Sequence, residues 1–478
     1  MKAMQRVLPD RPWPLHEVAA IRRLEQRAAA ALPPHALMQR AGLAVARLAL
    51  ALAPHARTLW IACGPGNNGG DGFEAAMHLK QWGKEPVVTW LGEETRAPED
   101  ARASLHRARA AGVVFAAQPP EAYDFALDAL LGIGATRKPE GPLLHQIDRL
   151  NAGAPVLAVD IPTALNADTG QATHAVRARH TLSLLALKPG LFTAAGRDAA
   201  GAVWFDDLGV EDGGSPTAIL AGPPPAVPRA HATHKGSYGD VAVIGGAPGM
   251  AGAALLCGRA ALSHGAGRVY VGFLDPAAPA LDALQPDLMV RPWDGLELAS
   301  MAVACGCGGG DAVRAALPAA LHAQALVLDA DALNTVAADA SLQALLAARG
   351  RGGAPTVLTP HPLEAARLLE LSTGDVQDNR LGAARDLARR FGSVVVLKGS
   401  GTVLAAPDGR VRINPTGNAR LAIAGTGDVL AGMVAARLAN GEDAFDAAAH
   451  AVYLHGLAAD RWPAGEPLTA AALASRAA

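Results

Sequence analysis

The chain has 478 residues, of which 50% are hydrophobic and 18% are charged, and its formal net charge is −2. This composition excludes a disordered or collagen-like chain, and the lack of a basic excess argues against sequence-independent nucleic-acid binding. Four cysteines do not make a disulfide framework in so long a chain, which favours a reduced, intracellular protein. The sequence has no run of about 20 apolar residues for a membrane span and no signal-peptide core near its start, so we expect a cytoplasmic protein.

The first half of the chain alternates short apolar segments, typical of buried parallel strands, with helical patterns. We predict helices at 15–31, 35–53, 72–82 and 98–111, and strands at 58–62, 86–90, 125–131, 155–160 and 181–187. Residues 222–228 are rich in proline and cannot continue a helix or a central strand. This segment predicts a stiff linker between a first domain, residues 1–221, and a second domain, residues 229–478.

The second half repeats the alternation of strands and helices, although the two halves do not look like copies. Strands are predicted at 240–244, 268–273, 302–305, 325–328, 356–358 and 393–397, and helices at 251–264, 363–371, 376–391, 429–440 and 443–462. Both halves therefore predict α/β folds with parallel sheets. Ligands of such folds bind at the carboxyl ends of the strands, which makes the residues after each strand the candidates for function.

A glycine-rich segment follows the first predicted strand of the sheet, with Gly64, Gly66 and Gly69 in the spacing G-x-G-x-x-G. This spacing lets the backbone approach a phosphate at the start of a helix, but a plain glycine-rich turn is the alternative. The polar residues of the same segment suggest a site that reads polar ligand atoms or holds a cation, and they are Asn67, Asn68 and Asp71.

Two carboxylates stand at the ends of neighbouring predicted strands, Asp128 and Asp160. A buried aspartate is costly unless it is paired or binds a metal, although a single one is often only a helix cap. Oxygen ligands from Asp128, Asn68 and Thr163 would suit an alkali or alkaline-earth ion better than zinc. Lys188 follows the next strand and either points into the same crevice or is a solvated loop lysine.

The second half lacks a P-loop motif, but Gly425, Thr426, Gly427 and Asp428 form a loop that runs into a helix. Such a loop offers free N–H groups and the positive end of the helix dipole to phosphate oxygens. Asp428 is placed to take a proton from a hydroxyl group that attacks a phosphoryl group, and a helix cap is the alternative.

The remaining candidates are a histidine and the cysteines. His361 follows a strand, so it either contacts a ligand or is structural. Cys305 and Cys307 form a C-x-C motif with no second pair nearby, which argues against zinc. We predict that these two cysteines, together with Cys63 and Cys257, are small buried residues.

Taken together, these motifs resemble those of the bifunctional NAD(P)H-hydrate repair enzymes over nearly the whole chain. The motifs of the first half are 37–42, 66–72, 128–132, 160–162 and 187–190, and those of the second half are 235–239, 359–364, 397–402 and 425–428. Members couple an NAD(P)HX epimerase domain to an ADP- or ATP-dependent NAD(P)HX dehydratase domain. The resemblance implies an N-terminal Rossmann-like three-layer domain followed by a ribokinase-like α/β domain.

The resemblance also implies roles for the matched residues. Those expected to bind the hydrated nucleotide in the first domain are Asn67, Asn68, Gly69, Gly70, Asp71, Gly132, Ile133, Gly134, Ala135, Thr136, Arg137, Lys138 and Asp160. Those expected to hold potassium are Asn68, Asp128 and Thr163. Those expected to line the hydrate site of the second domain are Ala254, Gly308, His361 and Asp428. Those expected to bind the adenine nucleotide are Lys398, Gly399, Ser400, Gly401, Thr402 and Gly427.

The implied activity has two stages. The first domain interconverts the R and S hydrates, with Asp160 as the proton-transfer group. The second domain uses ADP, with Mg²⁺ on the phosphates, to phosphorylate the hydroxyl group of the S hydrate, with Asp428 as the base. Phosphate then leaves and NAD(P)H is restored. ADP rather than ATP is implied by the resemblance to bacterial members, and we expect a homo-oligomer with no nucleic-acid or membrane partner.

Several positions depart from the family pattern. Ala164 and Cys307 stand where glycine and proline are usual, and Gly309 and Ala424 where a bulky residue and a glycine are usual. Three alternatives stay open. One is a ribokinase-like kinase of a small vitamin-like alcohol, another is a first domain that only binds or scaffolds, and the weakest is a plain dinucleotide oxidoreductase.

Overall fold

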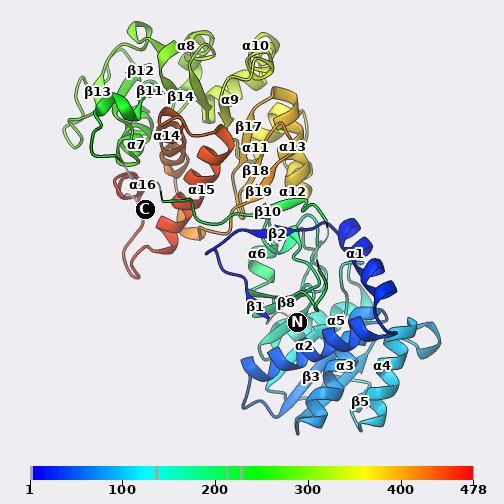
Figure 1. Cartoon of the computed structure of the whole chain (residues 1–478). Coiled ribbons are helices and arrows are strands. Elements are labelled where there is room, and N and C mark those ends of the chain that lie inside the picture. Colours follow the sequence, from blue (N-terminus) through cyan, green and yellow to red (C-terminus); the bar gives the residue numbers. More distant parts are fainter. Residues whose placement is uncertain (1–3, 135–137, 212–213, 227–229, 477–478) are drawn as a thin grey trace. The chain divides into compact units, whose positions relative to one another are not determined.

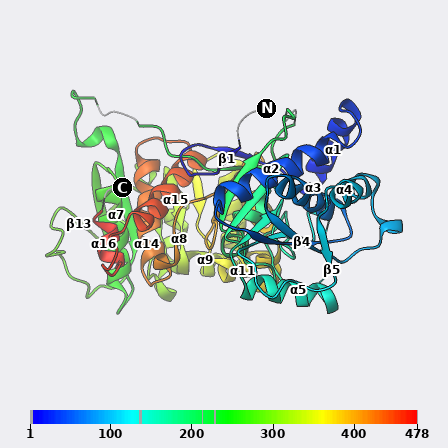
Figure 2. The ribbon, with the colours of Figure 1, turned by 90° about the horizontal axis from the view of Figure 1, so that it is seen from below.

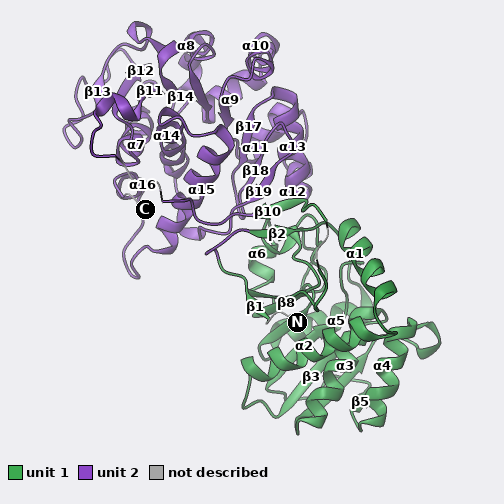
Figure 3. Cartoon of the chain, in the orientation of Figure 1, with its two compact units in different colours: residues 1–8, 13–219 green, residues 9–12, 220–478 purple. Residues whose placement is uncertain are grey.

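The computed structural model describes residues 4–134, 138–211, 214–226 and 230–476. The chain forms two compact units, residues 1–8 with 13–219 and residues 9–12 with 220–478 (Figure 3). The segment Pro9–Pro12 thus belongs to the second unit, and the Tyr453 hydroxyl donates a hydrogen bond to the Pro9 carbonyl. The sequence patterns did not predict this excursion. Two short strands, β2 (Trp13–Leu15) and β10 (Ala218–Leu220), lie where the chain passes between the units.

The first unit is built on one sheet whose strand order is β1-β9-β8-β7-β6-β3-β4-β5. All neighbouring strands are parallel except β1 and β9. The order reverses between β3 and β6, which is the point where open α/β sheets bind ligands. The strands are β1 (Gln5–Arg6), β3 (Thr58–Cys63), β4 (Glu85–Trp90), β5 (Val114–Ala116), β6 (Phe125–Ala129), β7 (Val156–Val159), β8 (His180–Leu184) and β9 (Ala202–Asp206).

Helices cover both faces of this sheet because its strands are apolar on both faces. Residues 59, 61 and 63 of β3 join one core with α2, α3 and α4, whereas Trp60 and Ala62 join a second core with α5. The strands and helices predicted in the first half are present, although α3 begins at Asn67 rather than at 72, and the additions are β1, β5, β9, α5 and α6. The helices are α1 (Val18–Ala31), α2 (Ala36–Leu52), α3 (Asn67–Gln81), α4 (Glu99–Ala110), α5 (Gly141–Ala152) and α6 (Gly196–Ala199) (Figure 1).

The sheet of the second unit runs in the order β13-β12-β11-β14-β15-β16-β17-β18-β19. The strands from β13 to β17 are parallel, and β18 and β19 are added antiparallel. The order reverses between β11 and β14. The strands are β11 (Asp240–Gly245), β12 (Arg268–Phe273), β13 (Met289–Val290), β14 (Ala302–Cys305), β15 (Ala325–Leu328), β16 (Thr356–Leu358), β17 (Val394–Leu397), β18 (Val403–Ala405) and β19 (Val411–Ile413). All six predicted strands are confirmed.

Alternate strand residues of the second unit face a core shared by α7 (Ala251–Ser263), α14 (Thr426–Ala439), α15 (Ala444–Asp460) and α16 (Ala470–Ala474) (Figure 2). The remaining helices are α8 (Val313–Ala320), α9 (Ala330–Ala337), α10 (Ala340–Arg351), α11 (Pro362–Leu369), α12 (Thr373–Asp378) and α13 (Arg380–Phe391). The single helix predicted over 376–391 is wrong in one respect. Asn379 separates α12 from α13, because its side chain accepts the Gly382 N–H at 2.9 Å and caps the second helix. No helix among the described residues is both long and apolar enough to cross a membrane.

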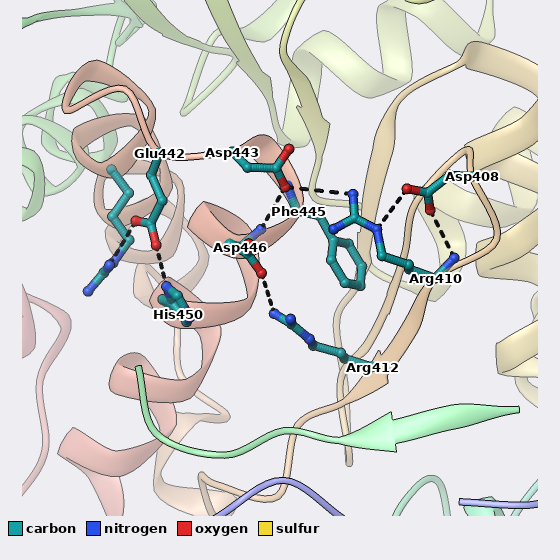
Figure 4. Close-up of polar contacts among 9 residues, drawn as sticks. Asp408, Arg410, Arg412, Glu442, Asp443, Phe445, Asp446 and His450 are labelled. Atoms are coloured by element: carbon teal, nitrogen blue, oxygen red, sulfur yellow. Dashed lines mark hydrogen bonds and ion pairs between the residues drawn. The ribbon is translucent and has the colours of Figure 1, made fainter. Parts of the chain in front are cut away.

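The start of α15 is fixed to the β18–β19 hairpin by a charged cluster (Figure 4). The Phe445 ring lies between the guanidinium groups of Arg410 and Arg412, each 4.8 Å from its centroid. Arg412 also pairs with Asp446 at 2.8 Å. Further along α15, His455 Nε2 lies 3.0 Å from the carbonyl of Thr426, the first residue of α14. The cluster therefore anchors the helix that supports the start of α14.

Candidate active sites

A cavity of about 680 Å³ opens in the first unit where the strand order reverses. The predicted residues that line it come from the start of α3 and from the segments after β6 and β7, and they are Asn67, Asn68, Asp71, Gly132, Ile133, Gly134 and Asp160. Gly69 and Gly70 lie in α3 outside the lining, and Lys138 is exposed. The predicted residues Ala135, Thr136 and Arg137 lie outside the described part of the chain.

The three glycines of the G-x-G-x-x-G motif have different roles in the structure. A Cβ atom at Gly64 would lie 2.6 Å from the Leu130 carbonyl carbon, and one at Gly69 would lie 3.0 Å from that of Gly64. Only Gly66 is open, with nothing within 4 Å of its Cβ position, and it lines the cavity. The predicted loop before residue 72 is wrong, because α3 already begins at Asn67. Two of the glycines thus serve backbone packing, and the first helical turn faces the cavity.

Two of the three predicted cation ligands, Asp128 and Thr163, are in direct contact in the interior of the first unit. Asp128 is fully buried and accepts the Thr163 N–H at 2.8 Å and the Thr163 hydroxyl at 2.7 Å. Burial raises the pKa of Asp128 to about 6, against the effect of these hydrogen bonds. The Asn68 amide nitrogen is buried and, among the described residues, has no hydrogen-bond partner. Ala164 follows Thr163 with φ +67°, a conformation that favours the glycine usual there.

Asp160 lies at the end of β7 with φ +68°, and its carboxylate borders the cavity. Of the two alternatives for Lys188, the solvated loop lysine is wrong, because its side chain is 0% exposed and its ammonium group contacts the Asp160 carboxylate. Buried lysines of this kind are rare unless they are paired.

Further cavity residues come from α1, α2 and α4, and none of them was predicted from the sequence. Glu25 and Arg22 come from α1, and His35, at the cap of α2, contacts Asp100 of α4. Burial, and then the charge of Asp160, raise the pKa values of Glu25 and Asp71. No local pattern marks Glu25 or Asp100 as site residues, because only packing brings these helices to the sheet.

The second site surrounds Asp428, in the first turn of α14 of the second unit. Its carboxylate, that of Asp329 after β15 and the Cys307 thiol lie within 4.8 Å of one another. Burial, and then the charge of Asp329, raise the pKa of Asp428 to about 6. Contact with Cys257 and burial hold the pKa of the Cys307 thiol well above its ordinary value, so the thiol stays protonated. All four cysteines are buried and free, as predicted.

Asp329 was missed, although it follows a strand just as Asp160 does. It accepts hydrogen bonds from Lys398 Nζ at 2.6 Å and from the Thr359 hydroxyl at 2.8 Å. The pKa of Lys398 is raised, because although burial lowers it, the charges of Asp329 and then of Glu364 outweigh that effect. The ammonium group of Lys398 is therefore committed to Asp329, beside the first turn of α14.

His361 caps α11 in a reciprocal arrangement. Its Nδ1 accepts the N–H groups of Leu363 at 3.1 Å and Glu364 at 3.3 Å, and Glu364 accepts the His361 N–H at 2.7 Å. Burial, and then Lys398, lower the pKa of His361, and burial raises that of Glu364 to about 7. His361 thus has a structural role as the cap of α11. Its ring is half-buried and is close enough to Lys398 and Asp329 to be affected by their charges.

The predicted nucleotide-binding segment, Lys398 to Thr402, turns between β17 and β18. Gly399 and Gly401 have φ values of +138° and +60°, which side chains rarely adopt. Beneath the turn, the buried guanidinium of Arg380 donates to the carbonyls of Leu397 and Lys398 at 3.1 Å each. Arg380, which the sequence analysis did not single out, therefore holds this turn in place.

The last predicted residues lie around the start of α7 and α14. Ala254 is fully buried, and a Cβ at Gly246 would lie 3.2 Å from its side chain. Gly308 has φ +57°, and a Cβ there would lie 2.9 Å from the Met250 carbonyl. A Cβ at Gly427 would lie 3.4 Å from Lys398 Nζ. Gly427 therefore lets the first turn of α14 approach the Lys398–Asp329 pair closely.

Comparisons with known proteins identify the family to which the two halves of the chain belong. Residues 34–190 match the model of the YjeF-related protein N-terminus, and residues 241–477 match the model of NAD(P)H-hydrate dehydratase. The bifunctional NAD(P)H-hydrate repair enzyme Nnr of Escherichia coli (strain K12) is 39% identical over 92% of this chain and 88% of that protein. The bifunctional NAD(P)H-hydrate repair enzyme of Leishmania braziliensis is 35% identical over 96% of this chain and 90% of that protein.

Among solved structures, the ADP/ATP-dependent NAD(P)H-hydrate dehydratase of Bacillus subtilis, co-crystallized with ATP/Mg²⁺, is 33% identical, covers 52% of this chain and 90% of that chain, and has a TM-score of 0.44. The predicted order of two α/β domains is confirmed, because each unit has its own mostly parallel sheet and the two family models match in the predicted order. The chain is a member of the bifunctional NAD(P)H-hydrate repair enzyme family.

Proposed function

We propose that the cavity of the first unit epimerises NAD(P)H hydrate and that the Asp428 site of the second unit dehydrates the S epimer with ADP. The observation that most supports this proposal is that each of the two units has a carboxylate at its candidate site. Asp160 borders the large cavity of the first unit, and Asp428 stands in the first turn of α14. We assign the epimerase to residues 1–221 and the dehydratase to residues 229–478, joined by residues 222–228.

In the first unit, the side chains and the first helical turn that line the cavity bind the hydrated nucleotide. Asn67 and Asn68 offer amide groups, and the free N–H groups at the start of α3 face the cavity as anion donors. Asp160 takes the proton of the ring hydroxyl group while the bond from the hydroxyl-bearing carbon to the ring nitrogen breaks, which gives an aldehyde and a protonated nitrogen. The reverse transfer recloses the ring on either face of the aldehyde, so that the carbon regains either configuration. A cavity of about 680 Å³ is of the size that such ligands require.

We propose that Asn68, Asp128 and Thr163 hold a potassium ion. All three offer oxygen atoms, which hard cations prefer. The amide nitrogen of Asn68 has, among the described residues, no hydrogen-bond partner. If the amide group is flipped, its oxygen takes that position and is free to bind a cation. The bound ion would supply fixed positive charge beside the substrate.

In the second unit, Asp428 removes the proton of the substrate hydroxyl group as its oxygen attacks the terminal phosphorus of MgADP. The bond from that phosphorus to the bridging oxygen breaks, and AMP leaves. The carbon–oxygen bond then breaks with both electrons going to phosphate, and the ring loses a neighbouring proton to form the double bond of NAD(P)H. Phosphate leaves more readily than hydroxide, which explains the need for a phosphoryl donor.

The test follows absorbance at 340 nm with purified protein, a mixture of R- and S-NADPHX, ADP, Mg²⁺ and K⁺. We expect full recovery of NADPH, beyond the S fraction and beyond the enzyme-free rate of epimerisation. Recovery that stops at the S fraction would make the first unit inactive or a binding module. The absence of ADP-dependent recovery, repeated with ATP, would favour the small-molecule kinase, which would leave a stable phosphorylated product.

The potassium assignment predicts that Asn68→Leu lowers the rate of epimerisation about 100-fold and abolishes its dependence on K⁺, because the variant removes one ligand of the ion. The measurement is a K⁺ titration of R-NADPHX conversion in the wild type and the variant. Dehydration of S-NADPHX by the same variant is the internal control and is expected to be unchanged. An unaltered K⁺ dependence would contradict the assignment.

Self-association and a cytoplasmic location stay predictions from the sequence.

A further inference from the structure

Lys188 is placed to act on the proposed epimerase through Asp160. Its side chain is 0% exposed, and its ammonium group has an acceptor for each of its three N–H bonds. These acceptors are the Asp160 carboxylate, the Ser183 hydroxyl at 3.1 Å and the Leu184 carbonyl at 2.9 Å. Because all three donors are used within the protein, Lys188 has no N–H left for the substrate, and Asp160 is its charged partner among the described residues.

The charges around Asp160 are otherwise mostly negative. Glu25 of α1 and Asp71 of α3 both raise the energy of a further negative charge there, and Asp100 of α4 adds to the same wall. Arg22 lines the cavity as well, and His35 is engaged with Asp100. Among the described residues, Lys188 is the one cation in ion-pair contact with Asp160. Its ammonium group is therefore the positive charge that offsets the Asp160 carboxylate beside these acidic side chains.

The backbone also requires a restraint at this point. Asp160 follows β7 and has φ +68°, and Leu185 follows the neighbouring strand β8 and has φ +65°. Both values lie in the left-handed region that non-glycine residues rarely adopt. Asp160 Oδ1 accepts the Leu184 N–H at 3.1 Å in addition to the Lys188 contact. Strained residues persist only where the surroundings hold them, and here the ends of β7 and β8 are held together through the buried ammonium group.

We infer that Lys188 is the positioning residue of the epimerase site, whose buried ammonium group holds the Asp160 carboxylate turned towards the cavity. This inference rests on the proposed epimerase function. It assigns Lys188 a role in proton transfer, although Lys188 does not touch the substrate.

The test measures kcat and KM for R-NADPHX conversion by Lys188→Met, coupled to excess Asp160→Asn protein, which supplies dehydratase alone. The enzyme-free rate is subtracted, and Lys80→Met is the matched control, since Lys80 of α3 is outside the described lining of the cavity. We expect kcat to fall about 100-fold in Lys188→Met while KM changes little, because Lys188 positions Asp160 but does not contact the substrate. The control should stay close to the wild type.

A loss that lies mainly in KM, or kinetics like those of the wild type, would overturn the inference. If Lys188→Met does not fold, Lys188→Ala is prepared and assayed with methylammonium, which should restore both folding and rate if the buried charge is what matters. Failure of the amine to restore either would assign Lys188 a purely structural role and also overturn the inference. If wild-type protein does not epimerise, the proposed function fails instead, so the two failures are distinguishable.

Discussion

Asp428→Asn is expected to abolish ADP-dependent release of NADPH from S-NADPHX while epimerisation continues. The substitution keeps the shape of the side chain but removes the base, and loss of a positioned general base lowers rates by about 10²–10⁴-fold. The first unit does not contain Asp428, so conversion of R- to S-NADPHX should persist, measured by chromatography of the two epimers. Asp386→Asn, which removes an exposed carboxylate of α13, is the control for loss of charge.

The same assignment predicts how dehydration depends on pH. Burial and Asp329 raise the pKa of Asp428 to about 6, so the carboxylate is ionised above that pH and protonated below it. Only the ionised form accepts a proton. We therefore expect kcat/KM for S-NADPHX to be constant well above pH 6 and to decrease below it, approaching a tenfold decrease for each pH unit. ADP-dependent NADPH release by Asp428→Asn, or a rate that rises on acidification, would show that Asp428 is not the base.

Gly64→Ala is expected to destabilise the first unit by about 3 kcal/mol or more, an effect at the high end of those for overpacked buried sites. Its Cβ would lie 2.6 Å from the Leu130 carbonyl carbon, so backbone must move against backbone where β3 and β6 end. The same movement would disturb the loop after β6 that lines the cavity, so epimerisation should fall as well. Urea unfolding, followed by the fluorescence of Trp60 and Trp90 of the first unit, measures the change.

Gly66→Ala, two residues along the chain, is the matched control. Its Cβ position has nothing within 4 Å and its φ of −102° suits alanine, so the urea midpoint should not change. Dehydration of S-NADPHX should be normal in both variants and shows that the second unit is folded. Equal urea midpoints for the two variants would mean that close packing of the backbone does not require a glycine at position 64.

The order and type of most helices and strands were determined by the sequence alone. Continuous apolar runs such as 58–62 and 325–328 are long enough for buried strands, and glycine and proline mark where elements end. Asp160 and Asp428 could be predicted because each follows a strand or opens a helix, positions defined by local chain order. The boundary inside 376–391 was not predicted, because a capping side chain such as Asn379 competes with a helical pattern that continues past it.

The tertiary structure decided which charges meet. Lys188 is buried against Asp160, and Asp329 lies between Lys398 and Asp428, but no spacing in the sequence distinguishes a paired lysine from a solvated one. Glu25 and Asp100 reach the cavity because α1 and α4 pack there, not because of their neighbours in the chain. Local patterns follow from the backbone period and the burial of apolar side chains. Contacts between distant charges depend instead on how whole elements pack and on the cost of burying an unpaired charge.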